Sequence, residues 1–130
     1  MKPNEKKAKE IFSRYVRLRD CIKTTGSEDY GKCITCGEIK HFSELHCGHF
    51  VSGRGNSLFF EENNSNCQCS ICNTTLGGAP EVYRMKMIKK HGLEEVERLE
   101  SLRHVPVKMR DSDFIELFQL FTSKFKNILD

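Results

Sequence analysis

Two pairs of cysteines in this chain have the spacing of metal-binding knuckles. Cys33 and Cys36 are separated by two residues and followed by a glycine, and the same spacing recurs in Cys69 and Cys72. Four thiolates from two such pairs match the closed tetrahedral site of a structural zinc ion. Redox motifs of this spacing usually occur singly, which argues against the alternative of disulfide chemistry. We therefore expect one structural zinc ion, with Cys67 as a less well-spaced substitute for Cys69.

The segment between the two pairs carries histidine and asparagine side chains that suit hydrolysis of a phosphodiester. His46 and His49 lie close together, Asn64 follows in a loop, and Asn73 comes directly after the last cysteine of the second pair. A neutral histidine can deprotonate water near pH 7, and an asparagine can hold the loop and orient the imidazole. A divalent cation would stabilise the charge that develops on the phosphate. This order resembles a ββα-metal (HNH) site; the alternative is that both histidines only surround the zinc ion.

Basic residues concentrate at the start of the chain. Residues 1–23 hold eight Lys or Arg side chains against three acidic ones, whereas the remaining 107 residues hold 13 basic and 15 acidic side chains. An N-terminal segment of charge +5 on a body of charge −2 favours a polyanionic partner such as DNA. A charged helix face that only keeps the protein in solution is the alternative.

The spacing of apolar residues predicts a helix over 4–22, with Asn4 as its N-cap. The face opposite the apolar stripe carries the candidate DNA contacts Lys6, Lys9, Arg14 and Arg17. Arg19 falls inside the apolar arc, so it is either a partly buried ion-pair partner or an arginine directed at a ligand. Arg54, between two glycines, is a further candidate phosphate contact, with a solvated loop arginine as the alternative.

The rest of the chain divides into a cysteine- and histidine-rich middle and a helical end. Short β-like runs are expected near 46–51 and 58–60, and helices over 79–91 and 93–103. A final amphipathic helix, capped by Asp111, carries a stripe formed by Phe114, Leu117, Phe118, Phe121, Phe125 and Ile128. We expect this stripe to pack in the core, with a dimer interface as the alternative.

Length and composition limit the class of protein. A chain of 130 residues with 38% hydrophobic residues predicts one domain, over 1–130, whose thin core a zinc site would stabilise. We expect it to comprise the basic helix 4–22, a zinc-knuckle core over 33–92 and C-terminal helices over 93–130. No stretch approaches the ~20 apolar residues of a membrane span, and no hydrophobic segment follows the charged start. We therefore expect a cytoplasmic protein with reduced thiols.

Three linked segments resemble one known family. The phage lambda NinG (Rap) recombination family is matched by GKCITCGEIKHFSELHCGHFVSGRG, LFFEENNSNCQCSICNTTLGG and EVYRMKMIKKHG, within a similarity that runs from about Tyr15 to Leu99. The order of knuckle, histidine, second knuckle and asparagine is also similar to the endonuclease VII-like junction resolvases. The resemblance implies a small α+β fold with a zinc-stabilised HNH core between N- and C-terminal helices. It also implies a phage or prophage protein that works in a bacterial host cell.

The same resemblance implies an activity and a set of residues. The activity is the cutting of branched DNA, such as D-loops and Holliday junctions, with Mg²⁺ or Mn²⁺ as the catalytic metal. Carried over by position, His49 matches the general base, Asn64 the HNH asparagine and Asn73 a ligand of the catalytic metal. The zinc set is matched by Cys33, Cys36, Cys69 and Cys72. A substrate with two symmetric strands would favour a homodimer.

One position departs from the HNH pattern. The residue before the base is often an Asp or His that binds the catalytic metal, but here it is Gly48. His46 is the nearest substitute, although residues 46 and 49 of a regular strand face opposite sides. A kink at Gly48 would be needed to bring them together. The competing hypotheses are a zinc-dependent nucleic-acid-binding module without catalysis and a zinc-scaffolded protein-interaction domain.

Overall fold

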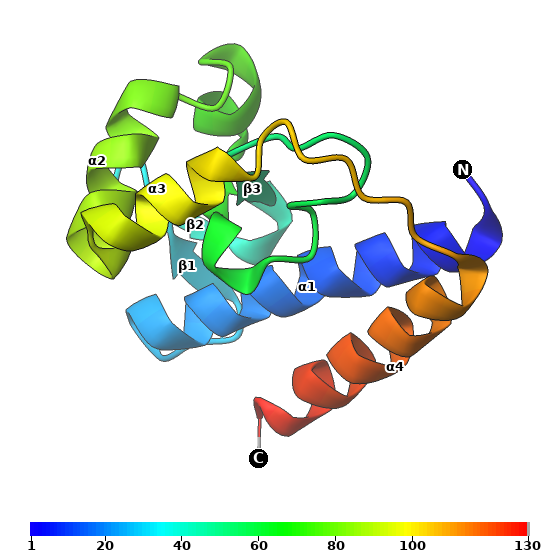
Figure 1. Ribbon diagram of the computed structural model, residues 1–130. Coiled ribbons are helices and arrows are strands. Elements are labelled where there is room, and N and C mark those ends of the chain that lie inside the picture. Colours follow the sequence, from blue (N-terminus) through cyan, green and yellow to red (C-terminus); the bar gives the residue numbers. More distant parts are fainter. Residues whose placement is uncertain (130) are drawn as a thin grey trace.

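A long N-terminal helix spans the molecule, and two small antiparallel strand pairs and further helices pack along it (Figure 1). The structure is a computed structural model that describes residues 1–129. Its elements are α1 (Pro3–Thr25), β1 (Tyr30–Lys32), β2 (Ile39–His41), η1 (Phe42–Glu44), β3 (Leu45–His49), η2 (Glu62–Asn64), β4 (Ser65–Cys69), η3 (Ile71–Thr75), α2 (Pro80–His91), α3 (Leu93–Ser101) and α4 (Asp111–Asn127). β1 pairs with β2, and β3 pairs with β4. The predicted α+β class is confirmed.

The helices lie close to their predicted positions, and the differences are at their ends. Lys2 is the N-cap of α1, whereas Asn4 lies inside the helix and donates from Nδ2 to the Asp111 carboxylate at 2.9 Å. The N-cap of α4 is Arg110 and not Asp111. Both predicted caps are therefore wrong, although both helices are confirmed. None of the helices in the described part of the chain is long and apolar enough to cross a membrane.

The β3–β4 pair forms the middle of the fold. Its register runs without a bulge from Leu45 opposite Cys69 to His49 opposite Ser65. The sequence pattern predicts neither β4 nor the β1–β2 pair, and the run predicted at 58–60 is a turn. The β4 sequence SNCQC has no β-branched or aromatic residue, so it carries no local strand signal. All five residues of β4 are buried, which indicates that pairing and packing stabilise this strand.

The hydrophobic core has two main parts. One part joins α2 and α3 to the loop after β3 and consists of Val51, Leu58, Tyr83, Met87, Val96 and Leu99. The other part joins α1 to α4 around Phe12, Tyr15, Val16 and Phe121. The rings of Phe12 and Phe121 meet edge to face, with 4.8 Å between their centroids. Core packing of the α4 stripe is therefore confirmed at Phe121, and Phe114 is buried as well.

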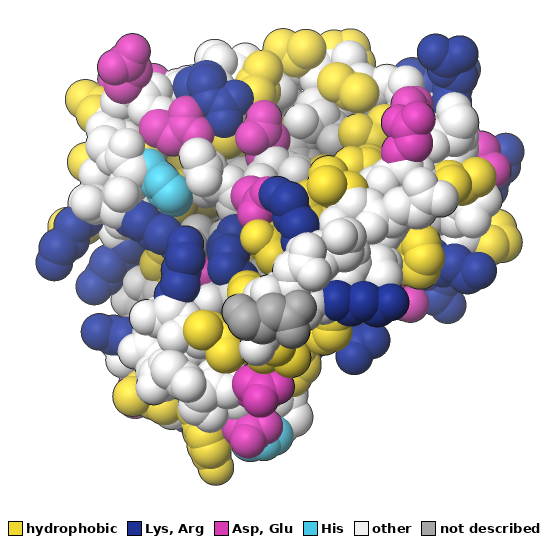
Figure 2. Space-filling view, turned by 90° about the horizontal axis from the view of Figure 1, so that it is seen from below, with side chains coloured by type: hydrophobic (Ala, Val, Ile, Leu, Met, Phe, Trp, Pro, Cys, Tyr) yellow, Lys and Arg dark blue, Asp and Glu magenta, His cyan; other side chains and the backbone are white. Residues whose placement is uncertain are grey.

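The outer part of the α4 stripe reaches the surface. Phe118 is 37% exposed, and the neighbouring Ile115 and Leu120 are exposed too. Seen from below, this side of the molecule shows hydrophobic side chains scattered among charged ones (Figure 2). The alternative of a dimer interface therefore concerns only the outer edge of α4, where it stays a prediction.

Candidate functional site

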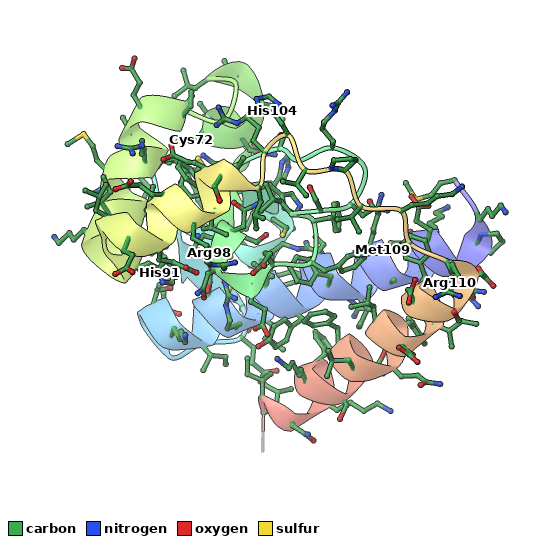
Figure 3. The ribbon with its side chains drawn as sticks, viewed as in Figure 1. Cys72, His91, Arg98, His104, Met109 and Arg110 are labelled. Carbon is green, nitrogen blue, oxygen red and sulfur yellow. The ribbon has the colours of Figure 1, made fainter. Side chains whose placement is uncertain are left out.

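Four cysteine side chains converge at one end of the β3–β4 pair. The sulfur atoms of Cys33, Cys36, Cys69 and Cys72 all lie within 4.8 Å of one another, with 3.9 Å between those of Cys36 and Cys69. Tetrahedral coordination at a Zn–S distance of about 2.3 Å would separate the sulfur atoms by about 3.8 Å. The cluster therefore fits a structural zinc ion. In Figure 3, Cys72 lies on the opposite side of the molecule from Arg110 at the start of α4.

Both knuckles direct hydrogen-bond donors at one of these sulfur atoms, that of Cys33. The Cys69 backbone N–H donates to Cys33 Sγ at 3.3 Å, and the Thr35 hydroxyl lies 3.2 Å from the same atom. Burial raises the pKa of the Cys33 thiol, but these hydrogen bonds outweigh burial and lower it to about 6. The thiolate is the form of cysteine that binds zinc, so the turn favours metal binding.

The other cysteines have packing roles. Cys67 packs with Cys21 and Leu45, and its thiol donates to the Arg17 carbonyl at 3.4 Å. The structure therefore assigns Cys69, and not Cys67, to the metal cluster. Cys47 lies against the α1–α4 core, where burial raises the pKa of its thiol to about 12.

His49 ends β3 and packs against two phenylalanine rings. Its ring centroid lies 4.5 Å from that of Phe59 and 6.3 Å from that of Phe12, and its Nδ1 is 3.1 Å from Ser65 Oγ. Desolvation, together with the positive charge of Lys9, lowers the pKa of His49 to about 4. The imidazole is therefore neutral near pH 7 and able to accept a proton.

Asn64 holds the loop that borders His49. Its buried side chain accepts from the Val51 N–H at 3.0 Å and donates to the carbonyls of Val51 and Leu58 at 2.9 and 3.3 Å. With His49 and Phe59, this loop lines a surface cavity of 140 Å³. The predicted loop-holding role of Asn64 matches these contacts. Its hydrogen bonds go to the loop backbone, so the contact that orients the imidazole comes from Ser65.

His46 and Asn73 meet on the other face of the β3–β4 pair, with 2.9 Å between His46 Nδ1 and Asn73 Nδ2. The unbroken register of β3 makes its side chains alternate, so His46 and His49 point to opposite faces. The kink at Gly48 that would bring them together is absent. Within residues 1–129, the cysteine cluster is the one group of three or more His, Cys, Asp or Glu side chains that could share a metal ion. The side chains around His46 therefore do not form a complete catalytic metal site.

Gly48 has a structural explanation in the close approach of a neighbouring side chain. A Cβ atom at this position would lie 2.3 Å from Gln68 Oε1. The Gly48 carbonyl also accepts a hydrogen bond of 2.6 Å from the buried Tyr83 hydroxyl. Gly48 thus permits the packing of Gln68 and Tyr83 on the face of the strand that carries His46.

The basic side chains predicted to contact DNA line one groove on α1. A surface groove of 430 Å³ is lined by the four predicted contacts together with Glu10 and Ser13. The four contacts are Lys6, Lys9, Arg14 and Arg17. Lys9 connects this groove to His49, because its ammonium lies 4.9 Å from the centroid of the Phe59 ring, which packs on His49. Arg17 also has a packing role, with its guanidinium 4.5 Å from the Phe42 ring centroid. Arg54 is exposed in the loop that Asn64 holds.

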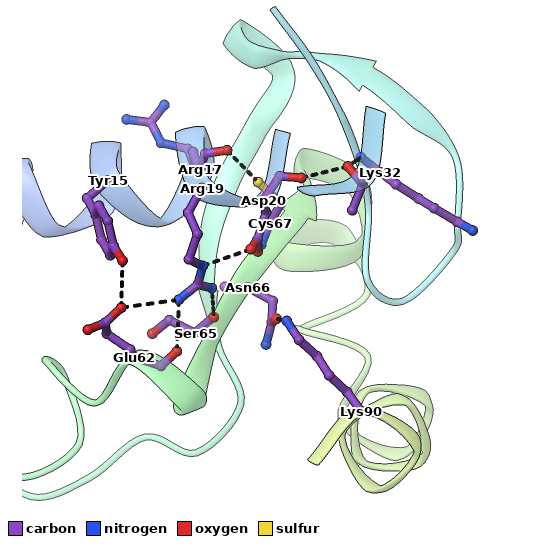
Figure 4. A network of polar contacts seen from close by, with 12 residues as sticks. Tyr15, Arg17, Arg19, Asp20, Lys32, Glu62, Ser65, Asn66, Cys67 and Lys90 are labelled. Carbon is purple, nitrogen blue, oxygen red and sulfur yellow. Dashed lines mark hydrogen bonds and ion pairs between the residues drawn. The ribbon is translucent and has the colours of Figure 1, made fainter. Parts of the chain in front are cut away.

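Arg19 connects α1 to β4 (Figure 4). Its Nε donates to Asp20 at 2.9 Å, and its Nη2 donates to the Ser65 carbonyl at 2.7 Å. Asp20 in turn accepts from the Cys67 N–H at 2.8 Å. The buried ion pair predicted as one role of Arg19 is therefore confirmed. Because Ser65 contacts His49, this network also fixes the partner of the imidazole.

Sequence reasoning missed three residues that surround His49, namely Ser65, Phe12 and Phe59. Phe12 and Phe59 look like ordinary core residues in the sequence. Ser65 becomes recognisable only when 65–69 is known to be a strand, because the antiparallel register then places it opposite His49. That strand has no sequence signal, so the contact could not be found.

Comparisons with known proteins point to bacteriophages. A model of the Bacteriophage Lambda NinG protein family matches residues 1–129. Over 97 residues, the chain is 30% identical to the ninG proteins of Escherichia phage 933W and Escherichia phage lambda, and 29% identical to that of Salmonella phage P22. The aligned region covers 74% of this chain and 43 to 44% of these relatives, so the chain spans less than half of their length. No solved structure matches the chain.

Proposed function

The chain belongs to the Bacteriophage Lambda NinG family, and from this premise and the geometry of the β3–β4 pair we propose that it is a zinc-stabilised DNA endonuclease of the HNH type. Its proposed substrates are branched recombination intermediates such as D-loops and Holliday junctions. The observation that carries the proposal is His49, a neutral imidazole beside a cavity and a basic helix.

His49 is the proposed general base. Contact of its Nδ1 with Ser65 leaves Nε2 to take a proton from water. The oxygen of that water forms a bond to phosphorus, and the bond from phosphorus to the leaving oxygen breaks, with its electron pair staying on that oxygen, which takes up a proton from solvent. A base with a pKa of about 4 is unprotonated but weak at neutral pH. A bound phosphate would raise the pKa of His49 toward the value that favours proton transfer, because an anion stabilises the imidazolium.

The groove on α1 is the proposed binding surface for backbone phosphates. Lysine and arginine contacts with phosphates supply affinity and orientation without reading the base sequence. Lys9 lines the groove, and its ammonium lies 4.9 Å from the centroid of the Phe59 ring that packs on His49, so a strand held in the groove would pass close to the imidazole. Asn64 keeps the bordering loop in place during this contact.

A divalent cation, Mg²⁺ or Mn²⁺, would stabilise the charge that develops on the phosphate. His46 and Asn73, the ligands that the sequence suggested for this cation, contact each other at 2.9 Å on the face of the strand pair away from His49, so they are not placed to hold it at that phosphate. Mg²⁺ retains several waters and binds phosphate oxygens directly, so it needs few protein ligands.

The proposal is tested by replacing His49 with glutamine. A general base acts only in the chemical step, so His49→Gln should lower single-turnover cleavage of a labelled four-way junction by about 10²–10⁴-fold. Zinc content and junction affinity should stay close to those of the unmodified protein. His104→Gln, the same change at an exposed histidine, is the control and should cleave normally.

Two outcomes would contradict the proposal. A folded, zinc-loaded His49→Gln variant that cuts at the parent rate would exclude His49 as the base. An unmodified protein that binds junctions but does not cut them with Mg²⁺ or Mn²⁺ would instead be a non-catalytic nucleic-acid-binding module. A separate His46→Ala variant should have lower thermal stability but unchanged cleavage by the folded protein, because His46 contacts Asn73 on the face away from His49. Loss of cleavage in a folded His46→Ala variant, with partial recovery on added Mn²⁺, would instead make His46 a metal ligand, because mass action offsets weaker coordination.

A further inference from the structure

A second hollow lies on the surface between the C-terminal end of α1, β1 and α2. It has a volume of 470 Å³ and is rimmed by Lys23, Lys32, Lys86, Lys89 and Lys90. Viewed from below, Lys and Arg side chains gather beside a histidine on the same side of the molecule as α2 (Figure 2). The five lysines come from three separate elements, so the fold and not one charged helix brings them together.

The positive charge of this hollow is not neutralised within the described part of the chain. None of the five rim lysines lies within 4.0 Å of a carboxylate oxygen of residues 1–129, whereas Lys9 and Arg98 are paired with carboxylates. Lys90 donates to the Asn66 side-chain carbonyl at 2.5 Å. Asp20, the one acidic residue that lines the hollow, is occupied by Arg19 and the Cys67 N–H. Figure 4 shows this arrangement of Asp20, Asn66 and Lys90.

We propose that this hollow is a second binding site for the backbone phosphates of nucleic acid. The inference rests on the proposed function, because it takes DNA as the polyanion. The hollow shares no lining residue with the α1 groove or with the cavity at His49. Lys9 and Lys23 are 14 residues apart on α1, which corresponds to about 21 Å along the helix axis. A DNA segment that reaches both sites therefore extends well beyond the phosphate beside His49.

The lining of the hollow favours a phosphate backbone over an acidic protein. It contains no aromatic side chain, and Ile34 is its one large aliphatic residue. Protein interfaces are rich in aromatic residues and poor in lysine at their centres, which is the reverse of this composition. Flexible ammonium groups suit phosphates whose positions vary with the bound sequence or branch.

A lysine-acetylation footprint of the unmodified chain tests where DNA binds. With a four-way junction present, Lys23, Lys86 and Lys89 should be protected from acetylation, while the exposed Lys108 and Lys126 should react as in the free protein. Polyglutamate and inorganic phosphate at matched ionic strength should give little protection. Equal protection by polyglutamate would indicate an acidic protein partner, and equal protection by inorganic phosphate would indicate a free anion. Either result overturns the proposal.

A pair of matched variants tests the contribution to affinity. Lys86→Gln with Lys89→Gln should weaken junction binding several-fold and lower the slope of log affinity against log salt by up to about 1.8, at about 0.9 per lost phosphate contact. Lys108→Gln with Lys126→Gln removes the same charge outside the hollow and should have a smaller effect.

The two proposals fail in different ways. Equal salt slopes in both double variants, with cleavage still lost in His49→Gln, would overturn the second phosphate site alone. Protection of the rim lysines by DNA in a protein that does not cut would overturn the endonuclease and support the second site.

Discussion

His49 occupies the last paired position of β3, so its surroundings depend on what lies opposite and around that position. Ser65 contacts Nδ1 of the imidazole, and Arg19 holds the Ser65 carbonyl from α1. Asn64 fixes the loop on the other side. Buried polar groups cost free energy unless they are hydrogen-bonded, and these side chains meet that condition. The role of Ser65, Arg19 and Asn64 is to hold His49 in place. Among these four side chains, only the neutral His49 imidazole can act as a base.

The lowered pKa of His49 predicts a pH dependence of stability. Its pKa falls from 6.5 to about 4 on folding. Between these values the unfolded chain binds a proton at His49 and the folded chain does not, so the free energy of unfolding falls as the pH falls from 6.5 toward 4. The full shift corresponds to about 3 kcal/mol, reduced by the partial exposure of the ring. Urea unfolding near pH 7 and pH 4.5 should show this loss.

Substitution separates this effect from other acid-sensitive groups. His49→Gln should lose less stability between the two pH values than the unmodified protein, whereas His104→Gln should behave like the unmodified protein. Acid titration of the zinc ligands affects all three proteins alike and cancels in the comparison. Identical pH dependence in all three would show that His49 is not desolvated.

At the level of elements, some features could be predicted from the sequence and others could not. Apolar periodicity, together with the end signals Pro80 and Gly92, identified the four α-helices of the described residues, and cysteine spacing identified the metal cluster, because these signals are local. β4 is stabilised by pairing and burial, which no local pattern records. The separation of His46 from His49 follows from the regular register of β3, and the sequence alone left open whether Gly48 would break it.

The metal cluster joins two elements that are distant in the sequence, so zinc should contribute to folding. Cys36 is exposed at the rim of the cluster, and its replacement leaves no buried cavity. Cys36→Ala should therefore report loss of the metal, which contributes on the order of 10 kcal/mol in structural sites and rivals the stability of a small domain. We expect about one zinc ion per unmodified chain by elemental analysis, and an unfolded, zinc-free variant.

Cys47→Ala, outside the cluster, is the matched control and should keep its zinc. A Cys36→Ala variant that stays folded, or an unmodified protein that stays folded in a strong chelator, would contradict this structural role.

At the scale of the whole molecule, a net charge of +3 conceals an uneven distribution. Positive charge gathers in the α1 groove and in the hollow between α1 and α2, while Glu61 and Glu95 pair with Arg98 elsewhere on the surface.

The relatives are more than twice as long as the aligned region, so the activity of a complete family member is part of the proposal. A homodimer on branched DNA, through the outer edge of α4, also stays a prediction.

The α1 groove predicts how the whole molecule binds DNA. Replacing Lys6, Arg14 and Arg17 together by glutamine should weaken binding to linear, branched and unrelated sequences by a similar factor, because phosphate contacts do not read bases. The salt slope should fall by up to about 0.9 for each lost contact. Since Arg17 also packs on Phe42, thermal unfolding must first show that the variant is folded. Replacing Arg103, Lys108 and Lys126 by glutamine removes the same charge elsewhere and should leave the slope nearly unchanged. Equal slopes in both triple variants would limit the groove charges to solubility and packing.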